Sequence, residues 1–283
     1  MSLYDHIAAC NKHDLDKFRE FTVAGTRVGW VEEEFAHKLE RWTHLFHLEQ
    51  GKVDLRGNVG GFDERSTAMT EVCAALVAQK AMPHSRNEFY AVARKFGDEA
   101  VMRLDRAWVP SFGTPAYGVH VNGYVETKRG PEIWVGVRAK DRDVAPGKFD
   151  NMVAGGLPYG VGLAENVVKE ADEEAGVPED LARQAVPVGA VSYTMEVEYG
   201  LRRDMLFIYD LKLPDDFRPH NRDGEISGFV RRPAEEVLRI VEETDEFKFN
   251  VNLVVIDFAI RHGILPPEHP DYVKLQRGLR SWG

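Results

Sequence analysis

The chain has 283 residues, of which 43% are apolar and 29% are charged, and its formal net charge is −10. This composition excludes a disordered or membrane-embedded chain, since no apolar run reaches the roughly 18 residues that a membrane helix needs. A strongly acidic chain without a basic run is also a poor nucleic-acid binder, because phosphate neutralisation supplies most non-specific affinity.

The N-terminus and the cysteines predict a cytoplasmic protein. The chain begins Met-Ser-Leu-Tyr-Asp-His, without the basic and apolar regions of a secretory signal. Neither Cys10 nor Cys73 has a neighbour at a metal-site or redox-motif spacing. We therefore expect two reduced thiols.

The first 108 residues predict a mixture of helices and strands. Hydrophobic spacing predicts three helices, over residues 14–21, 32–42 and 66–79, the last with Ser66 as its N-cap. Alternation of apolar and polar residues predicts two strands, over residues 26–31 and 89–94. No catalytic constellation is recognisable among them. We expect a structural or substrate-covering domain.

The pattern changes at residues 109–115, where the run Val-Pro-Ser-Phe-Gly-Thr-Pro marks a loop and a candidate domain boundary. We predict an N-terminal domain over residues 1–112 and a second domain over residues 113–283. The second domain contains four predicted strands, over residues 117–125, 132–138, 186–197 and 205–213. Its predicted helices span residues 164–175, 233–242 and 251–262, and the last lies between Asn250 and Gly263.

Residues 154–177 carry the chemistry, as a Gly-rich loop followed by a glutamate-rich helix. At roughly 100° per residue, Glu170, Glu173 and Glu174 fall within about 100° of one another around the helix. Three carboxylates at this spacing repel one another unless a cation lies among them. Oxygen ligands of this kind suit Mg²⁺ or Mn²⁺. The alternative is a solvated acidic helix face, which is what most Glu-Glu pairs on helices are.

This segment resembles the Nudix box, in which Gly, five residues, Glu and seven residues precede Arg-Glu-apolar-x-Glu-Glu-x-Gly-apolar. Gly155 takes the first position, and the second half is Lys-Glu-Ala-Asp-Glu-Glu-Ala-Gly-Val at residues 169–177. Val161 stands where the family has Glu, and Lys169 stands where it has Arg. The resemblance implies that those two positions form a structural pair, and their joint replacement leaves no lone buried charge.

The rest of the chain resembles Nudix proteins that carry an N-terminal extension and also occur fused to thiamin pyrophosphokinase. The stretches that match are residues 28–31, 118–124, 150–156, 209–211, 223–225 and 257–263. The resemblance implies an α/β fold, the Nudix α/β/α sandwich with a mixed sheet, preceded by a smaller α+β domain. It also implies hydrolysis of thiamin-type diphosphates to the monophosphate and phosphate.

The same resemblance implies roles for four glutamates. Glu170, Glu173 and Glu174 are the expected metal ligands, and Glu173 and Glu225 are the expected catalytic residues. A metal lowers the pKa of its bound water, and a nearby carboxylate can accept the proton. Glu225 lies in an Asp-Gly-Glu turn at residues 223–225, so a solvated turn residue is its alternative role.

Five further side chains are candidates for substrate binding: Arg138, Lys140, His120, Asn122 and Tyr193. The two basic residues lie at a strand end ahead of the box, where they could contact phosphate. His120 and Asn122 share one face of a strand, and a tyrosine suits a heteroaromatic ring. The alternatives are a solvated strand end, a structural hydrogen-bonded pair and core packing.

Together these features predict a Mg²⁺- or Mn²⁺-dependent hydrolase of a small-molecule diphosphate, with no nucleic-acid or membrane partner. A homodimer is compatible with the chain. One alternative is the same chemistry on a nucleoside diphosphate derivative. A second is a non-catalytic Nudix-fold binding or regulatory protein, which Val161 keeps open. A third is an isomerase on the same fold, which would release no phosphate.

Overall fold

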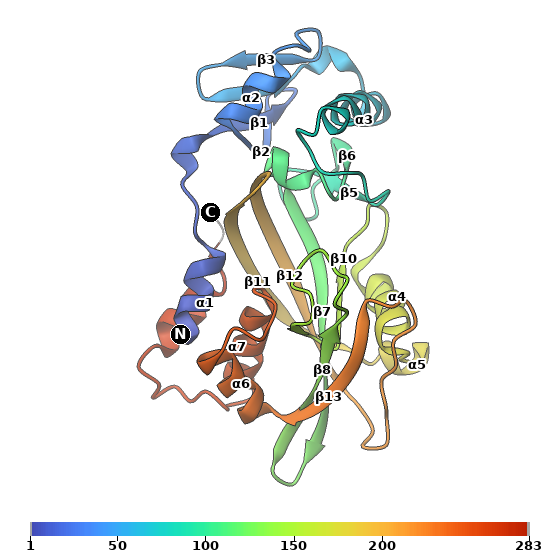
Figure 1. The fold of residues 1–283 in the computed structure, drawn as a ribbon, viewed down its shortest axis with the longest axis vertical. Coiled ribbons are helices and arrows are strands. Elements are labelled where there is room, and N and C mark those ends of the chain that lie inside the picture. Colours follow the sequence, from blue (N-terminus) through green and yellow to red (C-terminus); the bar gives the residue numbers. More distant parts are fainter. Residues whose placement is uncertain (1, 282–283) are drawn as a thin grey trace.

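The structure is a computed structural model that describes residues 2–281. A long central sheet carries helices on both faces, and a smaller unit from the N-terminal part of the chain lies across one end of it (Figure 1). Within residues 2–281, no helix is both long and apolar enough to cross a membrane.

The smaller unit is built on a four-stranded sheet in the order β2-β1-β4-β3. Its strands are β1 (Phe18–Val23), β2 (Thr26–Glu32), β3 (Phe46–Glu49) and β4 (Lys52–Leu55). Two helices, α2 (Glu33–Leu39) and α3 (Phe62–Ala78), and a two-stranded ribbon of β5 (Phe89–Val92) and β6 (Met102–Asp105) complete it. Three short 3₁₀ turns connect these elements: η1 (Leu15–Lys17), η2 (Gly57–Val59) and η3 (Val109–Phe112). One apolar core, from Phe21 to Ala116, holds the unit together.

Two sequence predictions in this unit are wrong. Residues 14–21 form η1 and most of β1 instead of a helix, because β1 pairs with both β2 and β4 and buries Phe21 completely. Such long-range pairing overrides local helix spacing. Ser66 is not an N-cap: α3 begins at Phe62, after Gly61. The Ser66 hydroxyl instead donates to Phe62 O at 2.6 Å and accepts from Arg103 N at 3.0 Å, which ties α3 to β6.

The central sheet has the order β11-β12-β7-β8-β13. Its strands are β7 (Pro115–Thr127), β8 (Gly130–Arg138), β11 (Val186–Val197), β12 (Gly200–Lys212) and β13 (Ile226–Pro233), with β10 (Val153–Gly156) beside β7 and β9 (Phe149–Asp150) beside β8. β12 and β7 run parallel, and the other pairs are antiparallel. The predicted α/β fold with a mixed sheet is therefore confirmed.

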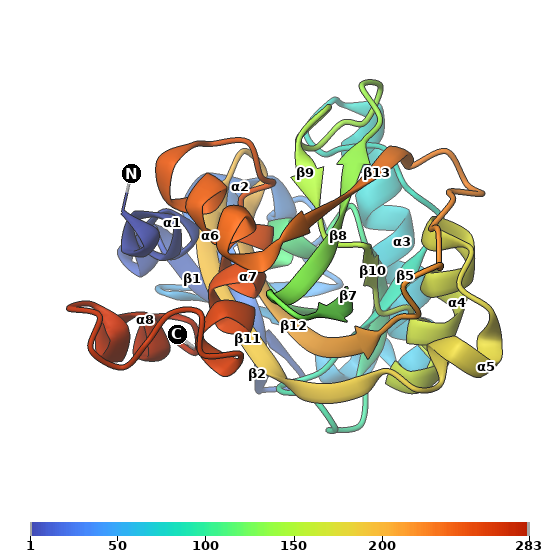
Figure 2. The same ribbon diagram turned by 90° about the horizontal axis from the view of Figure 1, so that it is seen from below.

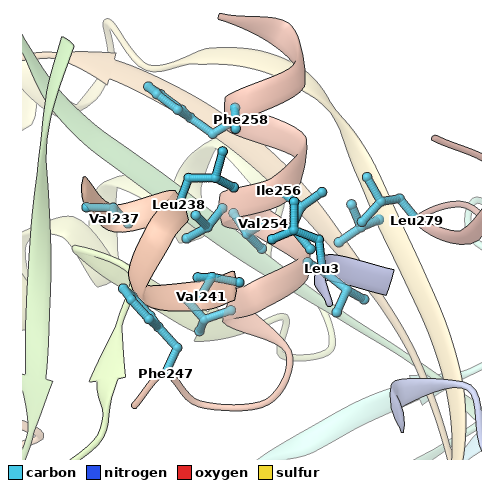
Figure 3. Close-up of a cluster of buried hydrophobic side chains, with 14 of the residues drawn as sticks. Leu3, Val237, Leu238, Val241, Phe247, Val254, Ile256, Phe258 and Leu279 are labelled. Carbon is cyan, nitrogen blue, oxygen red and sulfur yellow. The ribbon is translucent and has the colours of Figure 1, made fainter. Parts of the chain in front are cut away.

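Helices cover both faces of this sheet (Figures 1 and 2). On one face lie α4 (Leu163–Ala175) and α5 (Glu179–Ala182), whose apolar side chains share a core with β7 and β12. On the other lie α6 (Ala234–Glu243) and α7 (Val251–Arg261), joined by α1 (Leu3–Cys10) and α8 (Tyr272–Gly278). Figure 3 shows Leu3 and Leu279 beside Val254 and Ile256 of α7.

The helix α1 thus belongs to the core of the central sheet, although it comes first in the chain. The 3₁₀ turn η3 ends at Phe112, and Gly113 follows with φ +53°. The boundary between residues 112 and 113 stays a prediction. If it holds, α1 reaches back from the first domain to stabilise the second.

Candidate active site

The glutamate-rich helix α4 lies where the sequence predicts it. It ends at Gly176, whose φ of +61° is a left-handed conformation that favours glycine. On its inner side, Asn166 is fully buried and donates to Gly156 O at 2.8 Å. This bond fastens the Gly-rich loop to the helix. The sequence analysis did not single out Asn166, because an asparagine inside a helix carries no motif of its own.

Glu174 is a buried carboxylate that faces the loop. Its Oε2 accepts a hydrogen bond from Ala154 N at 2.7 Å. Burial raises the pKa of Glu174 well above its usual range, and the bond from Ala154 opposes that effect. The negative charges of Asp150, Glu170 and Glu225 raise the pKa further. Glu174 therefore lies in a pocket of negative potential.

Glu170 fills the space beside Gly155. A Cβ atom on Gly155 would stand 2.3 Å from the carboxyl carbon of Glu170, so any larger residue there would displace the carboxylate. Burial raises the pKa of Glu170, while the hydrogen bond from Lys169 Nζ at 3.1 Å opposes that effect. Repulsion from Glu173 and Glu88 raises the pKa of Glu170 further. The first glycine of the motif thus has a specific task, which is to let a carboxylate contact the loop.

Glu173, the third predicted ligand, points elsewhere. Its side chain is 44% exposed, and its Oε2 lies 2.7 Å from Lys169 Nζ. The structure therefore brings Glu170 and Glu174 together and leaves Glu173 in a surface ion pair. Lys169 binds these neighbouring glutamates and has no acidic partner at position 161, where the chain has a valine.

The donor chemistry fits a hard divalent cation. Glu170 and Glu174 offer carboxylate oxygens, and a cation beside them would offset the cost of burying their charge, which raises both pKa values. Across residues 2–281, no three His, Cys, Asp or Glu side chains already gather closely enough to hold an ion. The two glutamates would therefore share a cation with water or substrate oxygens, as Mg²⁺ sites commonly do.

Glu225 approaches the same site from the loop before β13. Its Oε1 lies 2.7 Å from Arg142 Nη2, and its side chain is about one-third exposed. Its charge acts on Glu174. The predicted catalytic residue from this later loop is thus near the buried glutamates, with an arginine that orients it.

The N-terminal unit contributes three residues that no sequence pattern marked: Glu88, Tyr90 and Arg106. The Tyr90 hydroxyl packs on Gly156, where a Cβ atom would stand 1.7 Å from it. Arg106 forms an ion pair with Glu88, and its guanidinium lies 5.9 Å from the centre of the Tyr90 ring. Although burial opposes it, the pKa of Arg106 is raised by Tyr90, Glu88 and Glu225. These residues lie far ahead of the box, so no local pattern connects them with it.

Two of the predicted substrate residues, His120 and Asn122 of β7, belong to a buried hydrogen-bond network. His120 Nδ1 lies 2.7 Å from Asn151 Oδ1, and Asn151 Nδ2 donates to Asn122 Oδ1 at 2.9 Å. Asn122 Nδ2 in turn donates to Asp210 Oδ1 at 3.0 Å. Their hydrogen-bonding groups are occupied by one another, so this geometry gives no support to direct substrate contact.

Of the remaining three, two form buried hydrogen bonds and one is exposed. Arg138 is buried and donates from Nη1 to Asp150 Oδ2 at 2.7 Å. Tyr193 is fully buried, and its hydroxyl donates to Asp204 Oδ2 at 2.6 Å. Lys140 is exposed in the loop between β8 and β9. A part in substrate binding stays a prediction for each of them.

The buried His120 predicts a specific pH dependence of stability. Burial lowers its pKa to about 4 from 6.5, with a further contribution from Lys248 against the opposing charge of Asp150. The folded protein therefore takes up this proton at a lower pH than the unfolded chain does. Stability contributed by the neutral form is complete above about pH 6.5 and is lost as the pH falls towards 4.

We expect acidification from about pH 7 to about pH 5 to cost about 2 kcal/mol through this histidine. Urea unfolding at the two pH values measures the change, and His120→Gln, which cannot take up a proton, is the comparison. The variant should lose less stability than the native chain over this interval. Equal losses in both would show that His120 is not the group responsible.

This chain is similar to several known proteins and to one family model. A family model described as a domain of unknown function, DUF4743, matches residues 2–116. Nudix hydrolase 24, chloroplastic, of Arabidopsis thaliana is 40% identical over 98% of this chain and 77% of its own length. Nudix hydrolase 20, chloroplastic, of the same plant is 37% identical over the same shares. The crystal structure of DR0079 from Deinococcus radiodurans is 20% identical, with a TM-score of 0.42, over 56% of this chain and 93% of that one.

The prediction of a cytoplasmic location is corrected by these relatives. Both plant proteins are chloroplastic by name, and each aligns with nearly the whole chain. The absence of a secretory pattern and the spacing of two cysteines were the grounds for the prediction. Neither observation separates the cytoplasm from an organelle whose thiols are also reduced.

Proposed function

The chain belongs to the Nudix hydrolase family, and on that premise we propose that it hydrolyses a thiamin-type diphosphate to the monophosphate and phosphate with Mg²⁺. As a family member it is an enzyme that acts on small-molecule diphosphates. The observation that carries the proposal is the pair of carboxylates, buried Glu174 and half-buried Glu170, held against a Gly-rich loop.

Glu170 and Glu174 are the proposed ligands of the cation. When bound, the cation would neutralise phosphate oxygens and supply a more acidic water. The protein's own work is to hold both carboxylates in place. The bond from Ala154 N orients Glu174, and the space beside Gly155 admits Glu170.

Glu225 is the proposed acceptor of the proton from the attacking water. It is partly exposed, its charge acts on Glu174, and Arg142 orients it at 2.7 Å. Glu173 stays a second candidate, and it would have to leave its ion pair with Lys169 first. Arg106, from the N-terminal unit, is the proposed cationic contact of the diphosphate, because the charge of Glu225 acts on it.

The thiamin-type substrate rests on the wider resemblance of the chain and on the aromatic side chains that lie next to the Gly-rich loop. Aromatic faces suit a heteroaromatic ring, and they would also accept a nucleobase. A nucleoside diphosphate derivative is therefore the second candidate substrate.

A panel of diphosphates assayed for phosphate release tests the proposal. With Mg²⁺ or Mn²⁺ present, we expect thiamin diphosphate and its oxidised analogues to be turned over with a higher kcat/KM than ADP-ribose. A chelator should abolish release, and adding back the metal should restore it. Faster turnover of ADP-ribose than of every thiamin-type diphosphate would remove the thiamin assignment, and no release from any compound would remove the proposed chemistry.

A further inference from the structure

A pocket lies beside the Gly-rich loop, between the N-terminal unit and the central sheet. Its volume is about 130 Å³. Six of its lining residues define its character: Tyr90 and Phe96 from the N-terminal unit, Tyr117 from β7, and Pro158, Tyr159 and Val161 from the loop. Four of these six are aromatic. The pocket is thus assembled jointly by two parts of the chain.

Phe96 is the most unusual member of this lining. It is 44% exposed, although phenylalanine is a residue that proteins generally bury. Its ring centre lies 5.0 Å from that of Tyr117 and 4.7 Å from that of Phe207. Together, Phe96, Tyr117 and Phe207 form an aromatic cluster with one exposed member. An exposed ring on such a cluster offers a face for stacking.

The N-terminal unit also holds the loop that forms the opposite wall. Tyr159 N donates to Phe89 O at 2.7 Å, and the Tyr159 ring stacks on Phe62 with their centres 5.0 Å apart. The Gly-rich loop is therefore anchored to the N-terminal unit by both backbone and side chain. The shape of the pocket depends on this contact.

The pocket and a proposed metal ligand contact adjacent glycines of the loop. Tyr90, which lines the pocket, packs its hydroxyl on Gly156. The carboxyl group of Glu170 packs on the adjacent Gly155. A diphosphate that shares a cation with Glu170 and Glu174 would therefore lie beside the stretch of loop that Tyr90 of the pocket contacts.

We propose that residues 89–98 of the N-terminal unit bind one heteroaromatic ring of the diphosphate's organic group, which lies against Phe96 and Tyr117, and so select the substrate. The inference rests on the diphosphate hydrolysis proposed above. It assigns a task to part of residues 2–116, the region that matches DUF4743.

The size and the lining of the pocket support one ring. An apolar cavity of about 150 Å³ accommodates benzene, so a space of about 130 Å³ suits a single six-membered ring better than two fused rings. Lys95 and Asp98 add polar groups to the wall, which a heteroatom of the ring can use.

The departure of the chain from the Nudix box is consistent with this role. Val161, which replaces the Glu of the box, lines the pocket. A carboxylate at this position would carry its charge into a small aromatic space, at a desolvation cost. Valine keeps the wall apolar. The replacement that weakens the match to the motif thus favours ring binding.

Binding measurements on the full chain test the inference. The probes are thiamin diphosphate, whose two heteroaromatic rings are not fused, cytidine diphosphate, which has one such ring, and inorganic pyrophosphate, which has none. Their dissociation constants are measured by calorimetry with Ca²⁺ present. The quantity of interest is the ratio of the affinity for a ring-bearing probe to the affinity for pyrophosphate. We expect Phe96→Ala to lower this ratio about tenfold, the usual effect of losing one stacking partner.

Tyr199→Ala is the matched control, since Tyr199 is 40% exposed in the turn between β11 and β12 and is not part of the pocket lining. Its ratio should stay within about twofold of the native value. Thermal unfolding of both variants checks that they fold.

An unchanged ratio in Phe96→Ala would overturn the inference, and so would a native chain that binds neither ring-bearing probe more tightly than pyrophosphate. Ring-dependent binding that needs Phe96, without any phosphate release, would support the pocket while removing the proposed hydrolysis. The two proposals can therefore fail separately.

Discussion

Replacing Glu174 by Gln lowers the rate of phosphate release by about a thousandfold, which corresponds to about 4 kcal/mol of activation free energy. The amide oxygen of glutamine can still accept the hydrogen bond from Ala154 N, so the loop keeps its anchor. The negative charge is lost. Without it, the site keeps only Glu170 of the two proposed ligands and cannot hold a divalent cation tightly.

The measurement is phosphate release from thiamin diphosphate over a series of Mg²⁺ concentrations. Glu165→Gln is the matched control, because Glu165 is an exposed carboxylate in the first turn of the same helix. It should keep near-native activity. Equal activity of Glu174→Gln and the native chain would show that Glu174 does not serve the reaction.

Replacing Asp150 by Asn lowers the free energy of unfolding by about 3–5 kcal/mol and the Tm by roughly 10 °C. Asp150 is 2% exposed and binds two cations, Arg138 Nη1 at 2.7 Å and Lys248 Nζ at 3.1 Å. Burial raises the pKa of Asp150, but Lys248, His120 and Arg138 outweigh that effect and hold the pKa below its usual range. Asparagine leaves both cations without their counter-charge in the interior, where an unpaired charge is costly.

Thermal and urea unfolding at neutral pH measure this loss. Asp245→Asn is the control, since its ion pair with Lys148 has the same geometry, at 2.8 Å, but lies at the surface, with Asp245 68% exposed. We expect a change of at most about 1 kcal/mol there, because solvent screens exposed pairs. If the two variants lose the same small amount of stability, the buried network is not what stabilises this side of the sheet.

Arg138 illustrates how far a local pattern can lead. The sequence places a basic residue at the end of a strand ahead of the Nudix box, and phosphate contact is a reasonable hypothesis for such a position. In the fold, β9 pairs with β8 and brings Asp150 beside Arg138. The guanidinium is satisfied by a partner 12 residues away along the chain. Hydrophobic periodicity in the sequence does not predict that Arg138 and Asp150 form an ion pair.

The sequence by itself determined the elements whose signals are local. The helix α4, its end at Gly176 and the strands β7, β8, β11 and β12 follow from apolar spacing and glycine positions, which depend on near neighbours alone. The spacing between Gly155 and the three glutamates is equally local, and through its resemblance to the Nudix box it indicated a hydrolase that uses a divalent metal.

Only the tertiary structure decided which side chains share the site. It placed the exposed carboxylate of Glu173 in an ion pair with Lys169, one turn away, while it buried Glu174 against Ala154 N. It turned residues 18–23 into a strand through pairing on both edges. It also brought Tyr90, Phe96 and Arg106 to the box from the other end of the chain. Contacts of this kind depend on how the two units pack, which no short stretch of sequence encodes.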